Sequence, residues 1–222
     1  MLQPSALLFL AVLTWAGVGQ EPKPARPRPK LEQLIQLPDD FVQYARVPDG
    51  GIRPQLAKGK EQLAVLYFKG EDAQGDYYLT RSTDEARSFT PGVRVNPTPG
   101  TVTLADGPPT SSIDLGPDGR AHVAWTSAGE TPSLFYACEP APGASELQVV
   151  ELGSMPGLSP VTALAVEASG QILLFSIATG PAADDGGEPW KAVYVRRSAD
   201  GKSFTAPVVI DRDKFDVSDQ SG

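Results

Sequence analysis

Few residue types in this sequence are suited to chemistry by themselves. The 222 residues include one cysteine and one histidine, so the sequence offers no cysteine pair for an internal disulfide and no histidine cluster for zinc. We interpret Cys138 as a buried thiol or a free strand residue, and His122 as a surface residue of a strand. The three carboxylates of Asp184–Glu188 could hold a calcium ion, but their spacing fits no fixed ligand pattern, which favours a solvated insertion. We therefore expect no metal and no cofactor.

The overall charge limits the partners that the protein can bind. The formal net charge is −8, which argues against nucleic acid and anionic membranes as main partners because both carry negative charge. Glycine and proline occur 22 times each, which favours many short strands and turns over long helices. With 41% hydrophobic residues, the chain can bury a core of ordinary size.

The N-terminal residues have the pattern of an export signal. Residues 6–18 form an apolar run that is too short to span a membrane, which takes about 20 helical residues. Small residues end this run, so we predict a signal peptide over residues 1–19 and an exported protein, periplasmic or extracellular. A buried N-terminal helix is the alternative. Residues 20–30 are rich in proline and are predicted to form an extended, disordered spacer.

The rest of the chain, residues 31–222, has the pattern of an all-β domain. After residue 40 there is no helical period of useful length, whereas short apolar runs alternate with polar turns. Asp118–Gly119 and Ser169–Gly170 lie between such runs and predict tight hairpin turns. The expected strands cover residues 62–68, 76–81, 93–95, 112–115, 121–125, 134–136, 147–152, 161–166, 171–177, 192–195 and 208–210.

Two polar turns of similar sequence connect strands in this domain. They are Ser82–Phe89 and Ser198–Phe204, and each follows a Tyr-x-x-Arg strand whose arginine, Arg81 or Arg197, is expected to be structural. In such a turn the short Asp side chain can accept hydrogen bonds from nearby backbone N–H groups, while the aromatic residue folds back into the core. The residues expected to hold the turns are Ser82, Asp84, Ser88 and Phe89 in the first, and Ser198, Asp200, Gly201, Ser203 and Phe204 in the second.

The spacing of these turns reveals a repeat. Tyr78, Tyr136 and Tyr194 lie 58 residues apart, so a middle copy exists, although its turn, Glu139–Pro142, lacks the Ser-x-Asp pattern. Because the three tyrosines occupy equivalent positions, we interpret them as packing residues of the core. The repeat predicts three units of four strands, typical of propeller blades. The units are expected near residues 50–98, 99–155 and 156–215.

The two turns resemble the Asp-box, or bacterial neuraminidase repeat, of the sialidase superfamily. The pattern Ser-x-Asp-x-Gly-x-Thr/Ser-Phe/Trp is matched at Ser82 with Ala86 in place of glycine, and at Ser198 with one residue missing before Gly201. The resemblance implies a six-bladed β-propeller whose Asp-boxes are structural and lie away from the active site. Six blades of this length take about 350 residues. We therefore predict an incomplete ring, the N-terminal portion of a longer protein, or alternatively a three-bladed unit that dimerises.

The same resemblance implies site residues. Sialidases use a Tyr nucleophile with a Glu partner, an Asp acid/base and three arginines that bind the substrate carboxylate. Gly51–Leu56 resembles the motif of the first arginine with one isoleucine lost, which makes Arg53 the candidate, with Arg46 second. Asp72, in the order Asp-Ala-x-Gly, resembles the acid/base, with Asp76 as runner-up and a solvated acidic loop as the alternative. The nucleophile, its Glu partner and the other arginines are not assignable in this chain.

Two functions are consistent with these features. The first is an exported exo-α-sialidase-like glycoside hydrolase that acts on terminal sialic acids of a carbohydrate substrate. The alternative is a non-catalytic Asp-box propeller that binds glycans or protein partners. The sequence does not determine the oligomeric state.

Overall fold

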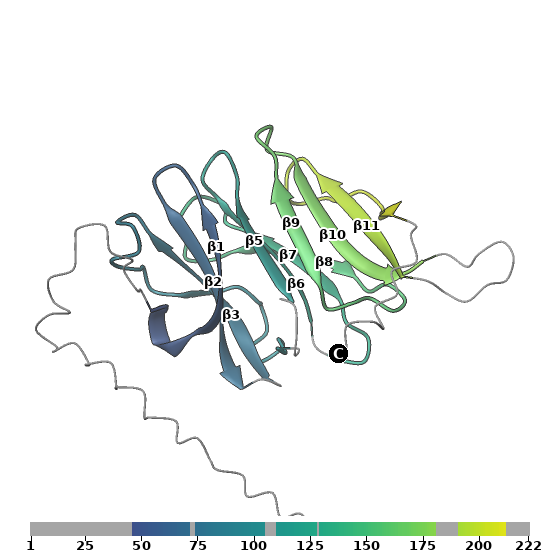
Figure 1. Cartoon of the computed structure of the whole chain (residues 1–222), viewed down its shortest axis with the longest axis horizontal. Helices are drawn as coiled ribbons and strands as arrows, with labels where there is room; N and C mark the ends of the chain where they lie inside the picture. Colours follow the sequence, from purple (N-terminus) through teal and green to yellow (C-terminus); the bar gives the residue numbers. More distant parts are fainter. Residues whose placement is uncertain (1–45, 72–73, 105–109, 128, 181–190, 212–222) are drawn as a thin grey trace, which may run out of the picture. The chain divides into compact units, whose positions relative to one another are not determined.

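The computed structural model describes residues 46–71, 74–104, 110–127, 129–180 and 191–211. Within these residues the strands form three antiparallel sheets, each a four-stranded meander in chain order (Figure 1). We call them sheet 1, sheet 2 and sheet 3. The all-β class and the three four-stranded units predicted from the sequence are confirmed.

Each sheet is made from one continuous part of the chain. Sheet 1 contains β1 (Ile52–Lys58), β2 (Leu63–Glu71), β3 (Gln74–Ser82) and β4 (Val93–Arg94). Sheet 2 contains β5 (Ser111–Leu115), β6 (Ala121–Thr126), β7 (Leu134–Cys138) and β8 (Gln148–Gly153). Sheet 3 contains β9 (Thr162–Val166), β10 (Ile172–Thr179), β11 (Lys191–Ser198) and β12 (Val208–Asp211). A short 3₁₀ helix, η2 (Pro48–Gly50), precedes β1.

The hairpins follow the turn residues in the sequence. Asp118–Gly119 links β5 to β6 and Ser169–Gly170 links β9 to β10, and both glycines have positive φ angles, of 78° and 84°. A residue without a Cβ atom adopts this conformation without strain, which is why glycine fits there. β2 and β3 are longer than predicted because Gly70 and Gly75 pair and continue the ladder toward the turn. A Cβ atom on Gly70 would lie 2.5 Å from the Cα atom of Gly75, so this close approach requires glycine.

Sheet 2 packs against both other sheets and is buried on both faces. All six residues of β6 are buried. Val123 and Trp125 belong to a core shared with sheet 1, whereas Ala124, on the opposite face, belongs to a core shared with sheet 3. Successive side chains of a strand point to opposite faces, so this single strand contributes to two cores. Among the described residues the three sheets do not close into a ring.

The interpretation of His122 as a surface residue is wrong. Its side chain belongs to β6 and is only 2% exposed. Alternation in a strand predicts an exposed face only where one side of the sheet meets water, and both sides of β6 are covered. Cys138 is buried, which was one of the two alternatives for it. Tyr136 and Tyr194 pack in the core between sheets 2 and 3 as predicted, whereas Tyr78 is only half-buried and stacks on the buried Tyr67.

Several predictions concern residues outside the described part of the chain. They are the signal peptide over residues 1–19, the spacer over residues 20–30, the acid/base candidate Asp72 and the loop Asp184–Glu188. Within the described ranges, no helix has the length and apolar character that crossing a membrane requires. The same ranges contain no group of three or more Asp, Glu, His or Cys side chains arranged to bind a metal ion.

A buried ion pair joins sheet 1 to sheet 2. Arg81 at the end of β3 donates a hydrogen bond from Nε to Glu139 Oε1 at 3.0 Å and a second from Nη2 to Glu139 Oε2. Its remaining N–H groups donate to Gln62 Oε1 and to the Gly119 carbonyl, and Glu139 also accepts the backbone N–H of Ala121. The two charged side chains are 7% and 1% exposed. Because they lie 58 residues apart, equivalent positions of successive repeats carry opposite charges and pair.

We expect Glu139→Gln to destabilise the fold by about 3–5 kcal/mol, because it leaves the Arg81 guanidinium buried without its counter-charge. Urea denaturation measures the free energy of unfolding. The matched control is Arg87→Gln, which removes an ion pair on the surface: the Arg87 side chain is 64% exposed and that of its partner Glu85 is 87% exposed. This control should stay within about 0.5 kcal/mol of the wild type. Equal effects of the two substitutions would contradict a structural role for the buried pair.

Candidate functional site

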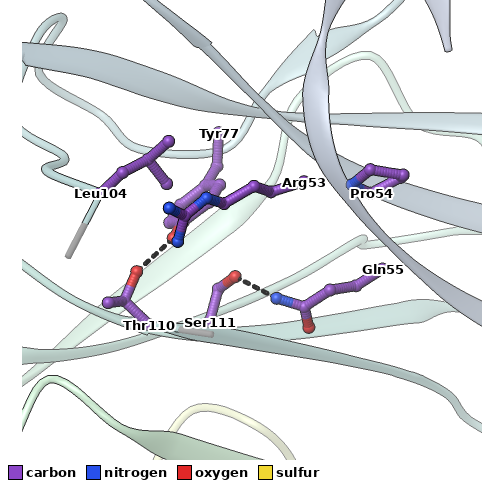
Figure 2. A pocket seen from close by; sticks show the side chains of 7 residues that line it. All are labelled: Arg53, Pro54, Gln55, Tyr77, Leu104, Thr110 and Ser111. Atoms are coloured by element: carbon purple, nitrogen blue, oxygen red, sulfur yellow. Dashed lines mark hydrogen bonds between the residues drawn. The ribbon is translucent and has the colours of Figure 1, made fainter. Parts of the chain in front are cut away.

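A pocket of about 300 Å³ lies where β1 of sheet 1 approaches β5 of sheet 2, and we call it the Arg53 pocket (Figure 2). Arg53, the sequence candidate for binding a carboxylate, is one of its lining residues, and its side chain extends from β1 toward Tyr77 and Thr110. The second candidate, Arg46, does not line this pocket. Among the described residues, the lining consists of Arg53, Pro54 and Gln55 of β1, Tyr77 of β3, Leu104, Thr110, and Ser111 of β5.

An irregular backbone directs Arg53 into this pocket. The register between β1 and β2 shifts between Ile52 and Gln55, so the ladder is interrupted around Arg53 and Pro54. Proline has no N–H group to donate to a ladder, which makes a strand irregularity a natural place for it. Arg53 itself has a φ angle of +50°, a left-handed conformation that costs a residue with a side chain of the order of 1–3 kcal/mol. Such irregularities re-aim side chains and are frequent beside functional sites.

Hydroxyl and amide groups surround the guanidinium. The Tyr77 hydroxyl and Thr110 Oγ1 are 2.5 Å apart and share a buried hydrogen bond between sheets 1 and 2. Gln55 Nε2 donates to Ser111 Oγ at 2.6 Å. Within the described residues, no carboxylate lines the pocket. A guanidinium together with hydroxyl and amide groups can donate hydrogen bonds to an anionic, hydroxyl-rich ligand.

Sequence reasoning missed most of the lining. Tyr77 was assigned to an expected strand but received no role, and Thr110 was not considered. A signal for Ser111 was present, because it lies 58 residues after Arg53, the same spacing that separates Arg81 from Glu139. The strand pairings agree with this period to within one residue, since Gln55 lies opposite Leu66, whereas Ile113, 58 residues after Gln55, lies opposite Val123, 57 residues after Leu66. The repeat thus predicts that the starts of β1 and β5 are equivalent.

Asp76, the runner-up for the acid/base, does not line the Arg53 pocket. Its Oδ1 atom accepts hydrogen bonds from Asn96 Nδ2 and from the backbone N–H of Gly100, both at 2.7 Å. Asn96 in turn accepts the backbone N–H of Tyr77 through Oδ1 at 3.0 Å. These contacts hold the connection between β4 and β5 against β3. The structural contribution of Asp76 is therefore to fix a loop.

The two Ser-x-Asp turns lie apart from the Arg53 pocket and are tightly hydrogen-bonded. Asp84 accepts hydrogen bonds from the Ser88 hydroxyl at 2.5 Å and from the Ser88 backbone N–H at 2.9 Å. Asp200 accepts backbone N–H groups of Ser203 at 3.0 Å and of Lys202 at 2.8 Å. These hydrogen bonds favour the charged carboxylate, led by those from Ser88 and Ser203 respectively, and lower the pKa of each Asp to about 2. The aspartates are thus held as anions within their own turns.

The second of these turns also packs between blades. The Phe204 ring meets the Tyr136 ring of sheet 2 edge-on, with 4.9 Å between the ring centroids. Gly201, at φ +70°, approaches the same tyrosine so closely that a Cβ atom would lie 2.8 Å from its hydroxyl oxygen. A glycine at this position therefore satisfies both the turn conformation and the contact between sheets 2 and 3.

A second polar cluster is buried rather than open. His122 Nδ1 lies 2.5 Å from the Tyr136 hydroxyl, and the Arg120 guanidinium approaches Cys138 Sγ at 3.8 Å. Burial lowers the pKa of His122, and the positive charge of Arg120 lowers it further, against a smaller opposing influence of Asp118. Burial also raises the pKa of Cys138, which keeps the thiol protonated. A neutral imidazole and a neutral thiol that are both buried indicate a packing role, because the nucleophile of a catalytic cysteine is an accessible thiolate.

Comparisons with known proteins support the fold and leave the activity open. No protein-family model matches the chain, and no curated protein matches it either. The chain is similar to the solved structure of a Penicillium chrysogenum α-L-arabinanase complexed with arabinobiose, with a TM-score of 0.51 and 12% identity over 76% of this chain and 52% of that one. It is also similar, with a TM-score of 0.47 and 16% identity over 70% of this chain and 50% of the other, to a Dyadobacter fermentans protein of unknown function.

The first of these likenesses, with the three meandering sheets, identifies the fold as that of a β-propeller. The chain spans about half the length of either solved structure, 52% of one and 50% of the other. At 12% identity the likeness concerns the fold alone.

We expect Arg53→Gly to be more stable than Arg53→Ala by about 1 kcal/mol, because only glycine relieves the strain of the positive φ angle. Chemical denaturation of the two variants measures this difference, and both lose the same arginine contacts. Lys58, in the extended part of β1, provides the control, since Lys58→Gly should be less stable than Lys58→Ala by about 0.5–1 kcal/mol. The same order of stability at both positions would show that the backbone at Arg53 is not strained.

We expect the stability of the fold to fall as the pH drops below about 6.5, the ordinary pKa of histidine. Because the folded state lowers the pKa of His122, the unfolded chain binds the proton first as the pH falls. The contribution of the neutral His122 to the free energy of unfolding is therefore fully present above about pH 6.5 and is lost progressively below it. The slope is at most about 1.4 kcal/mol per pH unit. Urea denaturation between pH 8 and pH 5 measures it. His122 is the single histidine of the chain, so His122→Gln should abolish most of this dependence; an unchanged slope would refute the assignment.

Proposed function

We propose that this chain belongs to an exported, sialidase-like glycoside hydrolase and binds the carboxylate of a terminal sialic acid through Arg53. The observation that carries the proposal is the position of Arg53, on a strained irregularity of β1 and on the wall of a pocket between two blades. The fold is compatible with this activity, since the chain resembles a propeller-fold arabinanase. The Ser-x-Asp turns, which resemble the Asp-boxes of sialidases, add a second line of support.

The chemistry of the pocket suits an acidic sugar. A guanidinium is planar, always charged and donates two parallel hydrogen bonds, which matches a carboxylate better than a lysine would. The hydroxyls of Tyr77, Thr110 and Ser111 and the amide of Gln55 can exchange hydrogen bonds with the hydroxyls of a sugar. In this proposal Asp72 supplies the proton to the leaving oxygen. The Tyr nucleophile, its Glu partner and two further arginines come from other parts of the complete protein, which acts in the periplasm or outside the cell.

A non-catalytic, glycan-binding propeller is the second candidate. It is favoured by the absence of a carboxylate from the described lining of the Arg53 pocket, because a glycosidase needs an acid close to the bond that it cleaves. Both candidates share the first step, the recognition of an acidic sugar by Arg53. They differ only in whether a bond is then broken.

We expect the chain to bind N-acetylneuraminic acid and to bind its methyl ester much more weakly, because the ester lacks the charge that Arg53 recognises. Arg53→Ala should weaken binding of the acid by about tenfold or more, the usual effect of losing a hydrogen bond to a charged group. Isothermal titration calorimetry measures both. Arg46→Ala removes the exposed second candidate and should leave the affinity unchanged. Equal affinity for acid and ester, or equal affinity of the Arg53→Ala variant, would exclude this role of Arg53.

Hydrolysis separates the two candidates. If the protein that contains this chain releases the fluorophore of a fluorogenic sialoside and Asp72→Asn reduces the rate more than it reduces binding, the hydrolase is supported. Binding of the sialoside without release of the fluorophore would favour the glycan-binding propeller instead.

A further inference from the structure

A second, larger pocket lies between the β4–β5 connection and strands β6, β7 and β8 of sheet 2, with a volume of about 490 Å³. We call it the Phe135 pocket. Its lining includes Asn96 and Thr98 of the β4–β5 connection, Trp125 of β6, Phe135 of β7, Ser127 just after β6, and Glu151 of β8. None of these residues lines the Arg53 pocket, so the two pockets are chemically independent. A volume of this size is within the range of small-molecule sites.

Two stacked aromatic side chains, Trp125 and Phe135, line part of this pocket, and we call them the aromatic platform. Trp125 and Phe135 stack with 5.3 Å between ring centroids and 11° between ring planes. Trp125 is 1% exposed and belongs to the core between sheets 1 and 2, so it supports the Phe135 ring from within, while Phe135 is half-buried and borders the pocket. The face of an aromatic ring carries partial negative charge, which attracts the weakly positive C–H groups of a flat apolar surface such as one face of a sugar ring.

The wall formed by the β4–β5 connection is held in place by Asn96. Its Nδ2 group donates to the Thr98 carbonyl and to Asp76 Oδ1 at 2.7 Å each, and to Thr101 Oγ1 at 3.2 Å. Its Oδ1 atom accepts the backbone N–H of Tyr77. Asn96 is 1% exposed and uses its hydrogen-bonding capacity internally, so it shapes the wall rather than binding a ligand. A wall fixed before binding reduces the entropy that a ligand must overcome.

Glu151 gives this pocket a charge opposite to that of the Arg53 pocket. It lies on β8 directly opposite Phe135 of β7, so its carboxylate stands beside the aromatic platform. Across the ranges that the structure describes, the Glu151 side chain is exposed and has neither a hydrogen-bond nor an ion-pair partner. A carboxylate accepts hydrogen bonds from neutral hydroxyl groups and repels anions. An acidic sugar or a phosphate is therefore disfavoured here.

We propose that the Phe135 pocket binds an uncharged sugar ring, which stacks on Phe135 and donates hydroxyl hydrogen bonds to Glu151. The Ser127 and Thr98 hydroxyls complete the polar rim. This proposal concerns a site distinct from that of the proposed function and does not depend on it. The protein then has two sugar sites of opposite charge preference, one for an acidic unit at Arg53 and one for a neutral unit at Phe135.

Isothermal titration calorimetry of the 222-residue chain with lactose and with cellobiose tests this site. We expect saturable binding of at least one of these neutral disaccharides and binding of galacturonic acid that is at least about fivefold weaker. Glu151→Ala should weaken binding of the disaccharide by about tenfold, as expected when a charged acceptor is lost. Phe135→Leu should weaken it to a similar extent. The matched control is Glu146→Ala, which removes an exposed carboxylate from the β7–β8 hairpin and should leave the affinity unchanged.

Three outcomes would overturn the proposal. They are no saturable binding of either disaccharide, wild-type affinity in Glu151→Ala, and binding that is lost in Arg53→Ala, which would place the neutral sugar in the Arg53 pocket. Because Glu151 is exposed, its replacement tests the site even if Phe135→Leu does not fold. Failure here leaves the proposed function standing, since that function is tested with acidic sugars and with Arg53.

Discussion

The burial of sheet 2 on both of its faces is the constraint on which the rest of the structure depends. A strand that is covered on both sides needs apolar or internally satisfied side chains at every position, and β6 has them at all six. Two buried polar side chains of this region have partners: His122 of β6 contacts the Tyr136 hydroxyl, and Glu139 accepts a hydrogen bond from Arg81. Unpaired, each would cost the free energy of a buried unsatisfied polar group.

The junction between sheets 1 and 2 holds both the buried ion pair and the candidate site. The ion pair of Arg81 and Glu139 and the hydrogen bond of Tyr77 with Thr110 both cross this junction, and the Arg53 pocket opens beside the second of these contacts. A site between two blades gains side chains from both, but each blade must hold its own residues in place. The irregularity of β1 at Arg53 does this for sheet 1, and the start of β5 does it for sheet 2.

The β4–β5 connection determines how the surface above this junction is divided. Its hydrogen bonds to Asp76 and Tyr77 fix its path over sheet 1. The Arg53 pocket and the Phe135 pocket share no lining residue among those that the structure describes. Residues of this connection line both pockets: Leu104 the first, Asn96 and Thr98 the second. A loop that is hydrogen-bonded at several points can line two rigid sites, whereas a loosely held loop would have to be ordered by each ligand.

Much of the fold was predictable because its signals are local. The turns Asp118–Gly119 and Ser169–Gly170 contain the glycines that positive φ angles require, and the short apolar runs around them are strands in the structure. Arg53 could be singled out by its neighbours in the sequence. The sequence did not predict that Arg53 lines a pocket with Tyr77 and Thr110, because these residues become neighbours only when sheet 1 packs on sheet 2.

The strands, the turns and the 58-residue period could be predicted from the amino-acid sequence, since they depend on local conformational preferences and on the order of residues along the chain. Which side chains are buried, and which of them contact one another, became known only from the packing of the sheets. His122, which alternation predicted to be exposed, is buried by this packing. In the middle copy, which lacks the Ser-x-Asp pattern, the first residue of the turn is Glu139, and it pairs with Arg81 of the first copy. The physical reason is that burial and pairing depend on the packing of one sheet against another, and no local pattern specifies that contact.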